Sequence, residues 1–248
     1  MYIYFKIDYM LNIKRLVFVS VILSCFFSAS RFYAQKINQF DANKKRTGVW
    51  RKFYPNKTIR YEGKFKNGKE IGVFKFYEKS SSKQPVIVKR YSEKSDSTKV
   101  EFYSSKGLLQ SEGFFIGKIR VGVWKFYFKN KKLMSEEFYD NGKLDGKTIN
   151  YYPDGKPTEI SFYKNGLKDG LSKKYSSDGI LIEEITYKNG KPNGLAKFFE
   201  LNGNLKEEGN YKNGKRVGEW EFYINGEAAS KNDIKNKKTF TKSKKGKE

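Results

Sequence analysis

A regular row of glutamates is the feature of this sequence that could most directly carry chemistry. Carboxylates that converge can bind a divalent metal ion or serve as acid and base in hydrolysis. If each glutamate sits in its own hairpin of a sheet, neighbouring carboxylates are two strands, or about 10 Å, apart and cannot share one metal ion. We therefore expect the row to lie on a solvated outer face of a sheet. Its members are Glu62, Glu112, Glu136, Glu184 and Glu208, with Ile160 as the exception.

The residue types needed for other common chemistries are scarce. The sequence has no histidine, so the usual general base and the commonest metal ligand are missing. Its single cysteine, Cys25, can form neither an intramolecular disulfide nor a cysteine-ligated metal site. Gly-x-x-x-x-Gly spacings occur, but none continues into the Lys-Ser/Thr step of a phosphate-binding loop. The sequence therefore predicts no enzyme, no cofactor and no metal site, and it does not identify the residues that bind a partner.

Lysines recur beside the expected turns and would form a basic edge along the sheet. Lys and Arg total 51 against 27 Asp and Glu, a formal net charge of +24. This excess favours anionic partners such as nucleic acid, acidic glycans or lipid headgroups. The recurring lysines could follow a polyanion, or they could serve to keep sheet edges from aggregating. They are Lys69, Lys118, Lys143, Lys191 and Lys215.

A row of glycines reveals the element that must position these side chains. An aromatic residue stands five residues after each of these glycines, and a second aromatic column follows later in most units. Asn-Gly and Asp-Gly steps recur between the columns and permit positive φ at both central positions, as a type I′ hairpin turn requires. The sequence thus predicts an all-β, elongated meander of antiparallel hairpins with about 24 residues per unit. The glycines are Gly48 and Gly72, then Gly122, Gly146, Gly170, Gly194 and Gly218, which follow one another at 24-residue steps.

Strand alternation assigns these columns to faces. The second aromatic column shares its face with residues that are mostly small, such as Gly63, Gly113 and Gly209, over which a neighbouring ring can lie. The third unit is irregular between Glu78 and Val100. There we expect Ser- and Lys-rich loops around a short strand from Val86 to Tyr91, with Ser97 near the place of the missing glycine.

The first residues have the layout of a secretory signal peptide. Lys14 and Arg15 precede an apolar run from Leu16 to Phe27, which is shorter than the roughly 20 residues needed to span a bilayer as a helix. We expect translation from Met10 and cleavage after Ala34, which leaves no transmembrane helix in the mature chain. An alternative interpretation makes Cys25 a lipoprotein cysteine. The predicted organisation is a signal peptide (1–34), a repeat domain of about eight units (35–229) and a lysine-rich disordered tail (230–248).

The repeat itself resembles a known family. The unit Gly-x-Trp-x-Phe-Tyr, then x-Asn/Asp-Gly, Glu-x-x-Tyr and Lys-Asn-Gly-Lys-x-x-Gly, is similar to the bacterial MORN-repeat variant over about residues 40–227. It also resembles the YwqK-type antitoxins of toxin–antitoxin systems. The resemblance implies a single-layer sheet with roles in protein interaction, membrane association or scaffolding. The antitoxin label implies a toxin bound in the cytoplasm, and the export signal departs from that implication.

These observations predict an exported, non-catalytic protein of the periplasm, cell envelope or medium. Its sheet would serve as a protein-interaction or scaffolding surface. The alternatives are an antitoxin- or immunity-like protein that neutralises a toxin, and a binder of anionic lipid or glycan surfaces. Nucleic acid is not expected as a physiological partner, because the aromatic columns belong to the core and export separates the protein from it. The sequence does not determine the oligomeric state.

Overall fold

The structure, a computed structural model, describes residues 36–230. The expected signal peptide with Met10 and Cys25, and the tail from residue 231 onward, lie outside the described residues. In the described part, 18 strands form one antiparallel sheet without helices. The predicted all-β meander is therefore confirmed. No helix in this part of the chain is long and apolar enough to cross a membrane.

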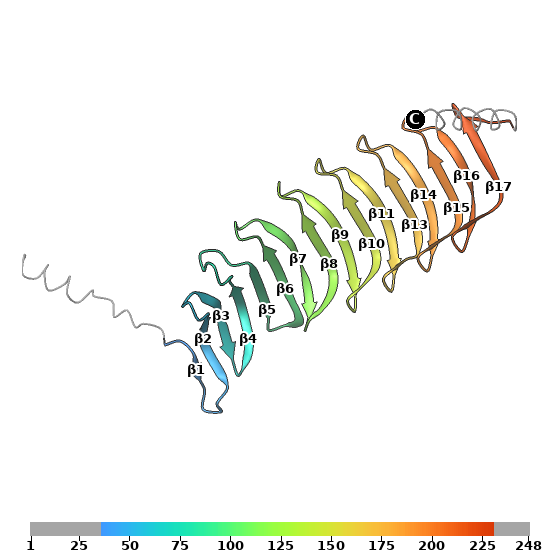
Figure 1. The fold of residues 1–248 in the computed structure, drawn as a ribbon. Coiled ribbons are helices and arrows are strands. Elements are labelled where there is room, and N and C mark those ends of the chain that lie inside the picture. The colour runs from blue at the N-terminus through green and yellow to red at the C-terminus, as the bar shows by residue number, and fades with distance from the viewer. Residues whose placement is uncertain (1–35, 231–248) are drawn as a thin grey trace, which may run out of the picture. The chain divides into compact units, whose positions relative to one another are not determined.

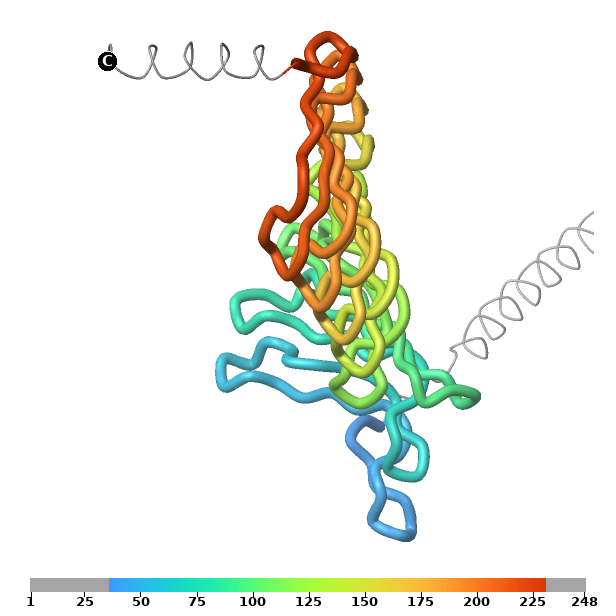
Figure 2. The backbone as a smooth tube through the Cα atoms, turned by 90° about the vertical axis from the view of Figure 1, so that its right-hand side faces the viewer, coloured from blue at the N-terminus to red at the C-terminus, as the bar shows by residue number. Residues whose placement is uncertain are grey.

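Each strand pairs with its neighbours in the chain, so hairpin follows hairpin along the sheet (Figure 1). One interruption occurs where the short β12 and the longer β13 both pair with β11. In Figure 2 the hairpins lie one behind another, and the sheet is a single layer. The strands are β1 (Gln39–Phe40), β2 (Arg46–Phe53), β3 (Ile59–Lys66), β4 (Lys69–Phe76), β5 (Ile87–Ser92), β6 (Ser95–Tyr103), β7 (Leu109–Ile116), β8 (Ile119–Tyr127), β9 (Leu133–Asp140), β10 (Lys143–Tyr151), β11 (Pro157–Lys164), β12 (Leu167–Lys168), β13 (Gly170–Tyr175), β14 (Leu181–Lys188), β15 (Lys191–Phe199), β16 (Leu205–Lys212), β17 (Lys215–Ile224) and β18 (Glu227–Ala228).

The turns along one edge of the sheet have the predicted type I′ conformation. Asn141 and Gly142, for example, have φ values of 46° and 80°. The Gly142 amide donates a hydrogen bond of 2.9 Å to the carbonyl of Arg120 near the start of β8, and equivalent bonds tie other turns to the start of the strand that follows the preceding turn. Because the turns stack in this way, the recurring lysines lie where they were expected. Lys69, Lys143, Lys191 and Lys215 each begin a strand, and Lys118 immediately precedes one.

Three turns along the opposite edge differ from the prediction, whereas a fourth, Asn225-Gly226, has positive φ at both residues, 53° and 87°, as predicted. At Asp154-Gly155 only the glycine has positive φ, 100°, and the same holds for the turns at Gly179 and Gly203. The Gly155 amide donates to the carbonyl of Tyr152, and the Tyr152 amide donates to that of Lys156. The turn therefore closes a longer loop, in which a single left-handed residue suffices.

The irregular third unit is more ordered than the sequence predicted. Instead of loops around one short strand, β5 and β6 pair from Ile87↔Phe102 to Ser92↔Ser95 through a tight turn. Ser97 lies inside β6, opposite Ile116. Only the stretch between β4 and β5 is irregular, with an isolated bridge from Glu78 to Ser81. Pairing on both sides, with β4 and with β7, outweighs the weak strand propensity of this serine-rich segment.

The core of the sheet is a column of side chains on one face, here called the ring face. Trp124 and Phe74 are 0% and 1% exposed although no second layer covers them in the described chain. Each lies directly over a glycine of the preceding strand. A Cβ on Gly113 would be 2.4 Å from the Trp124 ring, and one on Gly63 would be 2.4 Å from Phe74. The prediction that small residues allow rings to lie over the backbone is confirmed.

The ring–glycine pair is replaced by other steric pairs in some units. Where the ring is replaced by Ala196, the facing residue is the larger Ile185 instead of glycine. Where it is replaced by Ser172, the facing residue is Ser161, and their hydroxyls hydrogen-bond at 2.8 Å. Volume lost on one strand is thus regained on its neighbour, so the sheet keeps native-like packing density through changing units. The full column is Trp50, Phe74, Trp124, Thr148, Ser172, Ala196 and Trp220.

Candidate interaction surface

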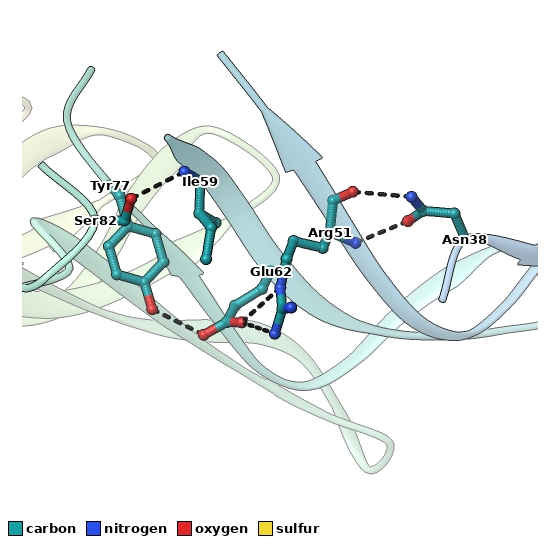
Figure 3. A network of polar contacts seen from close by, with 6 residues as sticks. All are labelled: Asn38, Arg51, Ile59, Glu62, Tyr77 and Ser82. Carbon is teal, nitrogen blue, oxygen red and sulfur yellow. Dashed lines mark hydrogen bonds and ion pairs between the residues drawn. The ribbon is translucent and has the colours of Figure 1, made fainter. Parts of the chain in front are cut away.

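The face opposite the ring face carries the glutamate row, and we call it the glutamate face. Figure 3 shows its first rung, in which Arg51 and Tyr77 converge on Glu62. The Arg51 guanidinium lies 2.9 Å from the carboxylate, and the Tyr77 hydroxyl donates to its other oxygen at 2.8 Å. Partial burial raises the pKa of Glu62, but these hydrogen bonds outweigh it and leave the pKa below its ordinary value. Burial and the same bond raise the pKa of Tyr77 to about 12.

The rung recurs along the sheet. Tyr127 donates to Glu112 at 2.6 Å, and this bond lowers the pKa of Glu112. All five glutamates of the row are half-buried and hold a basic partner across the strand, a tyrosine hydroxyl or both. The row lies on an outer face, as expected, but its carboxylates are paired and half-buried and do not stand free in solvent. The remaining contacts are Lys99–Glu112 (2.9 Å), Lys125–Glu136 (3.4 Å), Tyr151–Glu136 (3.0 Å), Lys173–Glu184 (2.9 Å), Lys197–Glu208 (3.0 Å) and Tyr223–Glu208 (2.9 Å).

At Ile160, the exception in the row, isoleucine replaces both members of the charged cross-strand pair. Its cross-strand partner is Ile149, at the position where other units carry the lysine or arginine. Charge is absent from both strands at once, so neither an unpaired carboxylate nor an unpaired ammonium is left. The rungs therefore join neighbouring strands. In residues 36–230, no cluster of acidic side chains could hold a metal ion.

The sequence analysis missed a second set of acidic residues, on the ring face. Glu159 accepts hydrogen bonds from Ser161 and Ser172 and pairs with Lys168. The signal was present in the doubled Glu-Glu of several units, since adjacent strand residues point to opposite faces. Glu183 and Glu207, at the same position of later units, pair with Lys174 and Arg216 at 2.7 and 3.0 Å. Glu137 also lies on the ring face and accepts hydrogen bonds from Ser135 and Tyr139.

A row of exposed apolar side chains crosses the glutamate face next to the rungs. It comprises Phe114, Val123, Phe138 and Phe162, with exposed fractions of 40, 44, 42 and 42%. Val123 of β8 lies directly opposite Phe138 of the neighbouring strand β9. Lys147 of β10 lies in the same line, opposite Phe162. We call these five residues, on five successive strands, the apolar row.

The fold does not require aromatic residues at these positions. The equivalent positions in the next two units, 24 and 48 residues after Phe162, hold Thr186 and Asn210. Both lie in regular hairpins. Phe138 and Phe162 lie over the glycines that open the next units, Gly146 and Gly170, and Thr186 takes the same place over Gly194 without an aromatic ring. A shallow depression of about 380 Å³ lies beside Val123, Phe138 and Lys147. A hydrophobic row that the hairpin can do without indicates a binding surface.

The fold and this surface define a class, the single-layer β-repeat sheet built from hairpins of about 22–24 residues. Five segments of the chain match the MORN repeat variant, namely residues 46–67, 120–141, 144–165, 168–189 and 192–213. Four of them follow one another, and the first two of these four contain Val123, Phe138, Lys147 and Phe162. No curated protein matches the chain.

Proposed function

We propose that this protein is an exported, non-catalytic scaffold that binds another protein through the apolar row. The observation that carries the proposal is the exposure of three phenylalanines and a valine on a face whose glutamate row is paired. MORN-type repeats are suited to such a role, because a stack of similar units offers a long surface without a deep pocket. Export is inferred from the signal-like sequence between Lys14 and Ala34.

The test exchanges row residues for those of other units. Phe138→Thr and Phe162→Asn each introduce the residue found two units later, Thr186 and Asn210, so the hairpins should form as before. Val73→Lys is the matched control, since Val73 is 41% exposed at a position where another unit carries Lys147. Chemical cross-linking in intact cells should link this protein covalently to one partner protein. Both phenylalanine variants should lose this cross-linked product, and the control should keep it. An adduct unaffected by either phenylalanine variant would refute the assignment.

Export is tested separately by the N-terminal sequence and the cell fraction of the native protein. The proposal requires a mature chain beginning near Gln35, outside the cytoplasm. A chain that retains Met10 in the cytoplasm would contradict export and favour an antitoxin-like role, in which the bound partner is a toxin.

Binding to anionic lipid or glycan is the competing function. It would use the turn lysines, such as Lys143 and Lys191, which form no ion pair in the described part of the chain. Vesicles of phosphatidylglycerol or an acidic glycan should bind these lysines in a manner that weakens with salt. Loss of the cellular adduct in Lys143→Ser and Lys191→Ser, with the phenylalanine variants unaffected, would favour this competing function.

A further inference from the structure

Resting on the proposed function, we infer that the partner contributes an amphipathic α-helix that lies along the apolar row, across strands β7–β11. The row presents one side chain from each of these strands, in the order Phe114, Val123, Phe138, Lys147 and Phe162. These strands are neighbours in the sheet, as Figure 1 shows. The side chains therefore form a row that crosses the strands, with Phe114 displaced along its strand because it pairs with Val121.

The spacing of this line matches the repeat of a helix. Adjacent strands are about 4.8 Å apart, so the row offers a contact every 4.8 Å or so. An amphipathic helix with apolar residues at alternating three- and four-residue steps offers one about every 5 Å, at 1.5 Å per residue. The two repeats stay in register over the four steps of the row, which span about 19 Å and require about 13 helical residues.

Backbone chemistry favours a helix over an extended segment. Strands β7–β11 are each paired on both sides, so the row is far from any open sheet edge to which another strand could be added. An extended segment laid across the row would leave its amides and carbonyls without partners as it displaced water. A helix satisfies its own backbone and presents only side chains, which suits a surface made of side chains.

Charge adds a further requirement. Lys147 is exposed within the row, and neither it nor the nearby Lys118 and Lys164 forms an ion pair in residues 36–230. Two nearby acids are already engaged, since Asp145 and Asp169 accept hydrogen bonds from the amides of Asn165 and Asn189. A third acid, Asp140, lies at the end of β9 and is exposed. The helix is therefore expected to place an acidic residue against Lys147, between its apolar contacts with Phe138 and Phe162.

The experiment measures the spacing of contacts on the partner. A photoreactive phenylalanine analogue replaces Phe114, Phe138 or Phe162 one at a time in the full-length protein, and the cross-linked residues of the partner are mapped by mass spectrometry. These three positions are two strands, about 10 Å, apart. A helix along the row gives linked residues about seven positions apart in one segment, in order. An extended segment gives a spacing of about three.

Each outcome decides a separate question. A spacing of about three, links to unrelated segments, or links to a second copy of this chain would overturn the helix while leaving a partner-binding row in place. No link from any row position would overturn the proposed function as well. Phe53, 46% exposed in the first unit, is the control position and should not link to the same segment. Lys147→Glu should lower the link yield from residues 138 and 162 several-fold, and Lys75→Glu should not; equal yields would overturn the acidic contact.

Discussion

The pairing of a ring with a glycine on the ring face makes a quantitative prediction. Gly113→Ser places a Cβ about 2.4 Å from the Trp124 indole, a distance that real side chains do not reach. The indole cannot move aside easily, since Phe115 packs against it at 5.0 Å between ring centroids and Arg120 lies 4.5 Å from its centre. Such overpacking costs about 1–3 kcal/mol. We expect Gly113→Ser to lower the free energy of unfolding by about 2 kcal/mol.

The matching change on the other strand removes the cause. Trp124→Ser alone deletes a fully buried ring and should cost about 3–5 kcal/mol. The double variant recreates the pair that Ser161 and Ser172 form two units later, with its 2.8 Å hydrogen bond. Its cost should therefore fall short of the sum of the single costs by about 2 kcal/mol, because no ring remains for the added Cβ to meet.

The assay is urea unfolding of all three variants, followed by circular dichroism. Gly48→Ala is the control, since Gly48 has φ +69° and no atom within 4 Å of an added Cβ. It should cost about 1–2 kcal/mol through backbone strain alone, and Trp124→Ser should leave that cost unchanged. Additive costs for Gly113→Ser and Trp124→Ser would refute the argument that ring and glycine are selected as a pair.

Three other predictions concern the strands, the rungs and their charge. Gly170→Val should lower the melting temperature more than Glu184→Ala, because Gly170 has φ +112° and an added Cβ would lie 3.2 Å from Phe162, whereas Glu184 loses one half-exposed ion pair; equal melting temperatures would contradict this. Ile160→Glu should destabilise by about 1–3 kcal/mol, because its half-buried carboxylate would face Ile149 on one side and, on the other, Lys173, which already pairs with Glu184. Adding Ile149→Lys should recover most of the loss in the same urea assay. The folded-state pKa values of Glu62, Glu112 and Glu208 lie below 4.5, so the stability that these carboxylates give is present above that pH and is lost as the pH falls through the lowered values. The melting temperature, measured as a function of pH, should therefore drop below about pH 4.5. The drop should be smaller in Tyr127→Phe, which lacks the hydroxyl that lowers the pKa of Glu112.

The repeat architecture could be read from the sequence because local rules dominate it. The 24-residue glycine step, the Asn-Gly turns and strand alternation each concern residues close together in the chain, and all agree on hairpins. The pairs that cross the sheet were harder to predict. Tyr127 and Glu112 are 15 residues apart, and their contact depends on register and on which neighbour a side chain leans toward. The glutamate row was therefore placed on the correct face but given the wrong environment.

The apolar row escaped the sequence analysis for a different reason. Phe114, Phe138 and Phe162 stand next to the second aromatic column, so they resembled further strand-forming residues. Only their exposure distinguishes them from buried neighbours such as Phe65, which is 4% exposed. In a single-layer sheet, hydrophobicity alone cannot tell a core column from a binding row, because both recur with the same period.

The two faces of the sheet therefore have separable roles. On the ring face, each change in one strand is matched by a change in the next, as in the pair of Ile185 with Ala196. The rungs of the glutamate face show the same matching where Ile149 meets Ile160. In the apolar row no such matching occurs, since phenylalanine, threonine and asparagine occupy equivalent positions of otherwise similar hairpins. Positions freed from the demands of strand pairing can change the partner without changing the fold, and the apolar row consists of such positions.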